Sequence, residues 1–283
     1  MFFCIFQRIL SVAALLLLSI TAVCGPALGQ TSGNLPSVQS FFEYPTLSGA
    51  KLSPNARYVA MLVSGKSGYM QLGLIDVTGG PPTVIANFDG ADILEFHWVN
   101  NDRLVFNAGN RNVGIGEQYK ANGLYAINRD GTGFRQLVQR DLQQQTSLGI
   151  LHNNILPWNT IFYGTVPNSD DIYVAQIDVE RKIRPIHLLR LDTKTGHATM
   201  IDRPGVTTKW VMDTQGVPRA VTTMDNDMES VYYFDPVQKS WRKLAEFNTY
   251  SGDGFQPYAF SPDGTLYVLS RNGTDKKSLY VMT

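Results

Sequence analysis

The stretch Leu52-Ser-Pro-Asn-Ala-Arg-Tyr-Val-Ala-Met-Leu-Val63 decides the fold, because its pattern returns near the end as Phe260-Ser-Pro-Asp-Gly-Thr-Leu-Tyr-Val-Leu-Ser270. Each copy has an apolar residue, a Ser-Pro-Asn or Ser-Pro-Asp turn, and then a run of β-forming residues. Pro presets φ for the turn, and the Asn or Asp that follows it tolerates the left-handed geometry that closes it. The apolar run is too short for a helix and predicts a buried strand. Two such hairpins in one chain indicate a repeat.

A second phrase recurs, in which apolar residues lead into an Asp or Asn. Its copies are Leu74–Asp76, Leu124–Asn128, Leu188–Asp192 and Val231–Asp235, with a fifth at Ser278–Met282 that stops about where its Asp would fall. The copies recur roughly every 45–60 residues, which is the period of propeller blades. The sequence therefore predicts an all-β fold, a β-propeller of four-stranded antiparallel blades with about five blades present and the last incomplete. A β-sandwich is the alternative, but it does not explain the ordered repetition.

The strands expected in the first unit are Ala60–Val63, Leu72–Val77 and Thr83–Phe88. Helical signals are poor, because Gly or Pro interrupts every candidate except Arg140–Leu148.

The N-terminal residues have the layout of a secretory signal peptide. Arg8 precedes the apolar run Ile9–Val23, and Ala27-Leu-Gly29 offers small residues for cleavage before Gln30. We expect a signal peptide at 1–29, a flexible lead-in at 30–40 and the propeller at 41–283. An uncleaved anchor and a lipoprotein at Cys24 are the alternatives. The predicted protein is exported, periplasmic or secreted, and holds no membrane segment after cleavage.

The composition limits which kinds of binding partner and metal site are expected. Lys plus Arg and Asp plus Glu number 24 each, so nothing indicates a nucleic acid or an anionic surface as partner. Both cysteines, Cys4 and Cys24, lie in the predicted signal peptide. The mature chain is therefore expected to form no disulfide and no Cys-ligated metal site.

The order of these motifs resembles the prolyl oligopeptidase family of secreted bacterial serine peptidases. Three further segments carry the resemblance: Phe96-His-Trp-Val-Asn-Asn-Asp-Arg-Leu-Val-Phe106, Gly123-Leu-Tyr-Ala-Ile-Asn-Arg-Asp-Gly-Thr-Gly133 and Leu188-Leu-Arg-Leu-Asp-Thr-Lys-Thr-Gly196. The resemblance implies an N-terminal propeller that admits small peptides and a C-terminal α/β-hydrolase domain with a Ser-Asp-His triad. The sequence departs from this plan, because it contains no Gly-x-Ser-x-Gly. We therefore expect a non-catalytic propeller segment, truncated before the hydrolase domain that is its missing partner. The isolated chain, an open ring, is expected to aggregate or to dimerise through its edge, or else to be the product of a truncated reading frame.

No residue is assigned as a catalytic, cofactor-binding or metal site. His97, His152, His187 and His197 are scattered, and a structural place is expected for each. Ser67 imitates a phosphate loop but lacks its first Gly, so a hairpin tip is expected. Gly114-Ile-Gly116 lacks a third Gly, and Asp170-Asp171 is expected to be solvated. Asp225, Asp227 and Glu229 alternate like calcium ligands but lack the loop's Gly and closing Glu.

Loops are where propellers place function, and the longest here are Ala108–Asn122 and Gln139–Asn159. The second holds Gln143-Gln-Gln145, His152 and Trp158, which either face a peptide cavity or lie on the surface. Two function classes stay open. One is the propeller segment of an exported peptidase that acts on short peptides; the other is a TolB-like periplasmic propeller that binds a protein or peptide.

Overall fold

A computed structural model of the chain describes residues 46–114, 120–140, 154–251 and 254–282. The predicted signal peptide (1–29), the lead-in (30–40), residues 141–148 of the candidate helical segment, and His152 lie outside these ranges. Residues 46–283 form one compact unit. Nowhere in the described ranges is there a helix long and apolar enough to cross a membrane.

The described strands form five antiparallel sheets, each with its strands in chain order. The first two sheets contain β1 (Leu47–Leu52), β2 (Tyr58–Ser64), β3 (Met70–Asp76) and β4 (Thr83–Ala86), then β5 (Asp92–Trp98), β6 (Arg103–Gly109), β7 (Leu124–Asn128) and β8 (Arg135–Val138). The third contains β9 (Thr160–Thr165), β10 (Asp171–Ile177), β11 (Ile186–Asp192) and β12 (Ala198–Met200). The fourth contains β13 (Thr207–Met212), β14 (Pro218–Asp225), β15 (Met228–Asp235) and β16 (Ser240–Asn248).

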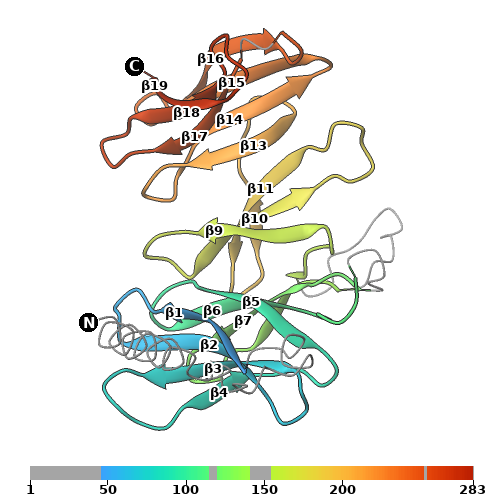
Figure 1. The fold of residues 1–283 in the computed structure, drawn as a ribbon, viewed down its shortest axis with the longest axis vertical. Helices are drawn as coiled ribbons and strands as arrows, with labels where there is room; N and C mark the ends of the chain where they lie inside the picture. Colours follow the sequence, from blue (N-terminus) through green and yellow to red (C-terminus); the bar gives the residue numbers. More distant parts are fainter. Residues whose placement is uncertain (1–45, 115–119, 141–153, 252–253, 283) are drawn as a thin grey trace, which may run out of the picture. The chain divides into compact units, whose positions relative to one another are not determined.

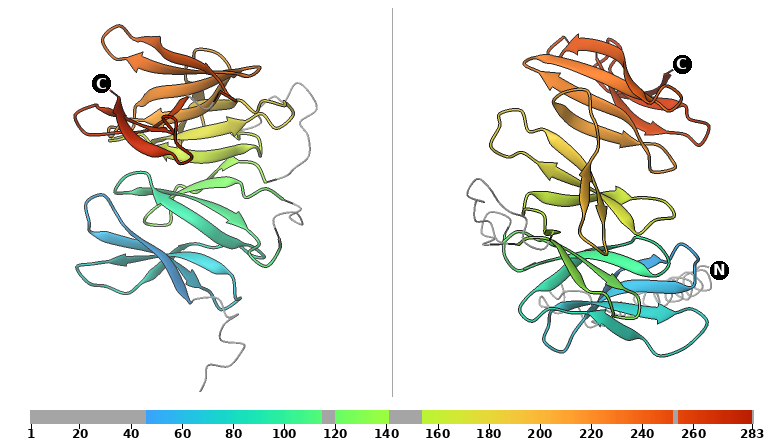
Figure 2. Two further views of the ribbon diagram at one scale, coloured as in Figure 1. Left: turned by 45° about the horizontal axis from the view of Figure 1, so that its top comes forward. Right: turned by 180° about the vertical axis from the view of Figure 1, so that it is seen from behind.

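The fifth sheet has three strands among the described residues: β17 (Phe255–Phe260), β18 (Leu266–Ser270) and β19 (Ser278–Met282). Each sheet is one blade of a β-propeller, so the predicted fold class is confirmed (Figure 1). Figure 2 shows the same blades from two further directions. We number the blades 1 to 5 along the chain.

The Ser-Pro turns join the first and second strands of blades 1 and 5, as predicted. In blade 1, the backbone N–H of Tyr58 donates to Ser53 Oγ at 3.0 Å, and Ala56 closes the turn with φ of 57°. In blade 5, the backbone N–H of Thr265 donates to Asp263 Oδ1 at 3.0 Å, and Gly264 closes the turn with φ of 87°. The left-handed position is therefore occupied by Ala in one copy and by Gly in the other.

Strand β1 was not among the predicted strands. Its sequence lacks a clear alternation, and most of its side chains are exposed. Gly49 has φ of 64°, and the pairing of β1 with β2 is irregular between Ser48 and Lys51. A bulged strand with little buried surface gives no period-two signal, so the sequence pattern missed it.

The recurrent phrase does mark the third strand of every blade, and its last residue has a definite role. Asp76 Oδ1 accepts from the Thr78 backbone N–H at 2.9 Å. Asp192 Oδ1 accepts from the Lys194 N–H at 2.7 Å, and Asp235 Oδ1 accepts from the Val237 N–H at 2.8 Å. These side chains build the turn that leads into the fourth strand.

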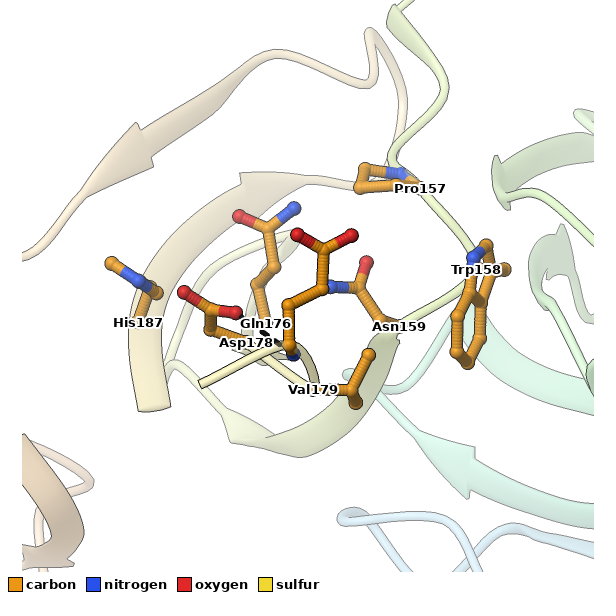
Figure 3. A pocket seen from close by; sticks show the side chains of 8 residues that line it. Pro157, Trp158, Asn159, Gln176, Asp178, Val179 and His187 are labelled. Carbon is orange, nitrogen blue, oxygen red and sulfur yellow. Dashed lines mark hydrogen bonds between the residues drawn. The ribbon is translucent and has the colours of Figure 1, made fainter. Parts of the chain in front are cut away.

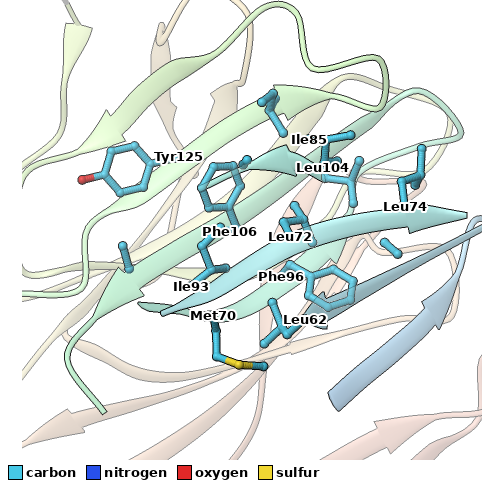
Figure 4. Close-up of a cluster of buried hydrophobic side chains, with 14 of the residues drawn as sticks. Leu62, Met70, Leu72, Leu74, Ile85, Ile93, Phe96, Leu104, Phe106 and Tyr125 are labelled. Carbon is cyan, nitrogen blue, oxygen red and sulfur yellow. The ribbon is translucent and has the colours of Figure 1, made fainter. Parts of the chain in front are cut away.

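Each pair of neighbouring blades encloses its own apolar cluster. Between blades 1 and 2, Leu72 of β3 and Phe96 of β5 are almost fully buried together with Phe106 of β6 (Figure 4). Three further clusters follow between blades 2 and 3, 3 and 4, and 4 and 5. Both faces of the inner blades are thus covered, which is why their strands read as nearly continuous apolar runs.

One buried guanidinium joins blade 2 to blade 3. Arg103, 2% exposed, begins β6 and reaches the turn after β11. Its Nε donates to Thr193 Oγ1 at 2.7 Å and its Nη2 to the Thr193 carbonyl at 2.6 Å. Its Nη1 donates to Asn128 Oδ1 at 2.7 Å and to the Gly133 carbonyl at 3.2 Å. Burial lowers the pKa of Arg103, while the carboxylates of Asp170 and Asp192 nearby raise it.

We expect Arg103→Met to lower the free energy of unfolding by about 3 kcal/mol, because it leaves buried acceptors of both blades without a donor. Urea denaturation followed by circular dichroism measures this loss. Arg57→Met is the control, since the Arg57 side chain is 53% exposed in its ion pair with Asp76 and its loss should change the free energy of unfolding far less. Equal effects of the two substitutions would contradict the assigned role of Arg103.

The two Ser-Pro turns allow a matched exchange. A Cβ at Gly264 meets no atom within 4 Å, so the cost of Gly264→Ala is confined to the backbone and should be about 1 kcal/mol. Ala56→Gly should stabilise by about 0.5 kcal/mol, because relief of the left-handed Ala exceeds the added entropy of the unfolded chain. Thermal denaturation of both variants measures whether each substitution raises or lowers the stability. A neutral Gly264→Ala is the outcome that this account does not allow.

Candidate functional site

Two adjoining hollows lie beside the segment that connects blade 2 to blade 3, and we call them together the Trp158 site. The smaller hollow has a volume of about 360 Å³ and the larger one of about 570 Å³. Trp158, Asn159 and Val179 line both of them. In the view of Figure 3, Trp158 and His187 stand on opposite sides of the smaller hollow.

Backbone pairing positions the segment that carries Trp158. Leu156 forms a parallel bridge with Val138 at the end of β8, and its N–H donates to the Leu137 carbonyl at 2.8 Å. Asn159 Nδ2 donates to the Ile177 carbonyl at 2.7 Å, and the Ile177 N–H donates to the Asn159 carbonyl at 3.0 Å. The segment is therefore held between the outer strand of blade 2 and strand β10 of blade 3.

The smaller hollow is lined mainly by polar side chains. Gln176 comes from β10, Asp178 and Glu180 from the connection that follows it, and His187 from β11. Asp178 Oδ2 lies 3.0 Å from Arg181 Nε, and Asp178 Oδ1 accepts from the Glu180 N–H at 3.2 Å. His187 Nδ1 is buried without a hydrogen-bond partner in the described part of the chain. Burial lowers the pKa of His187, and the positive charge of Arg203 lowers it further.

The larger hollow combines apolar and amide side chains. Ile161 is 51% exposed and Val179 is 41% exposed, which leaves apolar surface open at its wall. Asn107 Oδ1 accepts from the Glu95 N–H at 2.9 Å. The remaining lining residues that bear on its chemistry are Glu95, Lys120, Asn122, Leu124 and Phe162.

A His–carboxylate pair adjoins this hollow. His97 Nε2 lies 2.8 Å from Glu95 Oε1, and the His97 ring stacks on Phe162 at 4.2 Å between ring centroids. Burial lowers the pKa of His97, and the charge of Lys51 lowers it further against the opposing effect of Glu95. Both histidines near the site are thus favoured in the neutral form.

The two longest loops both contribute to the site. Ala108–Asn122 supplies Lys120 and Asn122, and Gln139–Asn159 supplies Trp158. Gln143-Gln-Gln145 and His152 lie outside the described residues. No short motif in the sequence contains Gln176, Asp178, Glu180 or Glu95. Pairing of β10 with β9 brings Gln176 opposite Thr160, close to Trp158 in the chain, and Glu95 lines the larger hollow from blade 2.

The other motifs have structural places. Ser67 lies in the hairpin between β2 and β3, and Asp225 and Asp227 lie at the exposed hairpin between β14 and β15. The Asp170 carboxylate pairs with Lys194 Nζ and that of Asp171 with Arg190 Nε, so both have ion-pair partners on blade 3. Gly116 lies outside the described residues. Within the described ranges, no group of three or more His, Cys, Asp or Glu residues is placed to hold a metal ion.

Comparison with solved structures agrees with the fold. A structure from a study of two prolyl endopeptidases is similar with a TM-score of 0.51 and 13% identity, over 84% of this chain and 34% of that one. The β-propeller domain of the Trilobed protease from Pyrococcus furiosus has a TM-score of 0.46 and 10% identity, over 84% of this chain and 68% of that one. TolB from Acinetobacter baumannii has a TM-score of 0.36 and 12% identity, over 82% of this chain and 55% of that one.

The shared feature is the propeller. At 13% identity, the similarity to the prolyl endopeptidase establishes a common fold and no common activity. This chain spans about a third of that chain's length, 34%. The other two TM-scores lie below 0.5 and support no separate inference. No family model and no curated protein matches the chain.

The neutral histidines make stability depend on pH. The folded-state pKa of His187 is lowered, so the unfolded state binds more protons as pH falls through the ordinary pKa of about 6.5. The stability that the neutral His187 ring contributes is fully present above that pH and is lost as pH falls toward the lowered pKa. We expect His187→Gln to make the urea midpoint less sensitive to pH between about 7.5 and 5.5. His197→Gln, at an exposed position, is the control; an unchanged slope in His187→Gln would be inconsistent with a buried neutral ring.

Proposed function

We propose that this propeller is the non-catalytic, substrate-gating part of an exported serine peptidase similar to prolyl oligopeptidases. The observation that carries the proposal is the similarity to a prolyl endopeptidase over 84% of this chain, where the match covers 34% of the longer protein. The motif order from Leu52 to Gly264 supports it independently, because that order resembles the same family.

In this proposal, hydrolysis belongs to an α/β-hydrolase domain that works with the propeller. The sequence holds no Gly-x-Ser-x-Gly, which is the turn that exposes the nucleophile in such domains. The role of the propeller is to select which peptides reach that domain. Short peptides pass or dock at the Trp158 site, whose amide side chains match peptide groups and whose apolar wall at Ile161 and Val179 accepts side chains. The residues 1–29 direct export, and the enzyme acts in the periplasm or outside the cell.

A TolB-like binding module is the second candidate. The turn Ser261-Pro-Asp-Gly264 is compatible with it, since periplasmic propellers of the TolB type share this turn with the peptidase family. Such a module would bind a protein or peptide partner with no hydrolase attached.

Two measurements test the proposal. The purified chain should release no chromophore from prolyl amide substrates, because the described residues only gate the substrate; a rate that scales with protein and survives repurification would overturn this. The coding sequence that continues past residue 283 should specify a Ser elbow followed by an Asp and a His. An unrelated protein encoded there would contradict the peptidase assignment and favour the TolB-like module.

A further inference from the structure

The smaller hollow of the Trp158 site presents hydrogen-bond acceptors and no cation among its lining residues. Its polar groups are Asn159, Gln176, Asp178, Glu180 and His187, and none of the described lining residues is Lys or Arg. A pocket that lacks donors with a positive charge is complementary to a ligand that brings them. Arg181, which pairs with Asp178, and Arg203, whose charge acts on His187, do not line the hollow, so Glu180 is the lining carboxylate that a cationic group can pair with.

The acceptors are largely unused. The Glu180 carboxylate makes no ion pair with any residue that the structure describes, whereas Asp178 is already paired with Arg181 at 3.0 Å. Asn159 uses its Nδ2 as a donor to the Ile177 carbonyl, which leaves its Oδ1 as an acceptor. His187 has its Nδ1 buried without a partner in the described residues, and its lowered pKa favours the neutral form, in which one ring nitrogen accepts a hydrogen bond. A ligand with several N–H donors would satisfy groups that the chain itself leaves unpaired.

The indole of Trp158 distinguishes between the two cations that peptides carry. It borders both hollows, so a ligand bound there contacts its ring. A guanidinium is planar, stacks on aromatic faces and carries five donors, whereas an ammonium is compact and strongly hydrated. The combination of an indole with dispersed oxygen and nitrogen acceptors fits the planar cation better.

The larger hollow constrains the rest of the ligand. Ile161 and Val179 are 51% and 41% exposed, and Phe162 lies beside them. Because side chains two positions apart in an extended peptide point the same way, an arginine in the smaller hollow places the side chain of residue i+2 or i−2 toward this apolar wall.

We propose that the Trp158 site binds short peptides that carry an arginine in the smaller hollow and an apolar side chain two positions away in the larger one. This inference rests on the proposed function, because it names the peptide class that the propeller selects. Glu180 and Trp158 recognise the guanidinium, and Ile161 with Val179 contacts the apolar residue.

Calorimetric titration of the purified full chain tests the inference with acetyl-Arg-Gly-Phe-amide. The matched probe replaces Arg with citrulline, which keeps the shape and removes the charge. We expect the arginine peptide to bind about tenfold more tightly. Glu180→Gln, at an exposed position that should not affect folding, is expected to reduce this preference, and so is Trp158→Leu. Glu246→Gln and Trp241→Phe on blade 4 are the matched controls and should leave it unchanged.

Each outcome decides the matter. Equal affinity for the two peptides, a preference that survives Glu180→Gln, or no binding of either peptide would overturn the inference. The proposed function is judged separately, because the hydrolase coding sequence and the absence of amide hydrolysis do not depend on arginine. An arginine preference without an encoded hydrolase would support the site while contradicting the peptidase assignment.

Discussion

The structure depends on the burial of each sheet against its neighbours. A single four-stranded sheet has two faces, and in the inner blades of this chain both are apolar. The four clusters between successive blades satisfy that requirement in chain order, with Phe96 and Phe106 at the first boundary and Trp210 at the third. Removal of apolar surface from water is the main favourable contribution to such packing. Blade position is therefore set by side chains on sheet faces, and loops are free to differ.

Polar groups add direction to this apolar packing. Arg103 reaches from blade 2 into blade 3, and its guanidinium donates to neutral oxygens of both blades: Asn128 and Gly133 in blade 2, and Thr193 in blade 3. Hydrogen bonds to a buried charge require exact placement of both partners, so they fix how one blade is rotated on the next. The Trp158 site lies at the same boundary between blades 2 and 3. Side chains of both blades line its larger hollow, whereas the connecting segment and blade 3 line the smaller one.

The sequence predicted the repeats better than it predicted the site. The Ser-Pro turns and the Asp-terminated third strands were recognisable because their geometry is local and depends on few residues. Strand β1 was not predicted, because its bulge at Gly49 and its exposed side chains leave no period-two pattern in the sequence. For the site, loop length pointed to Trp158, and no signal pointed to Glu180 or Glu95. Glu180 reaches the site through the pairing of β9 with β10 and Glu95 through the packing of blade 2 on blade 3, and neither is recorded in a short sequence pattern.

The carboxylates that end the third strands have a consequence for how such a chain can arise and diverge. Asp76, Asp192 and Asp235 each organise a turn within their own hairpin. A short coding segment therefore specifies that turn without contacts from the rest of the protein. A duplicated hairpin would thus form its own turn without further changes. Its other positions could then accumulate substitutions, so that copies of one ancestral hairpin would share little beyond the terminal Asp.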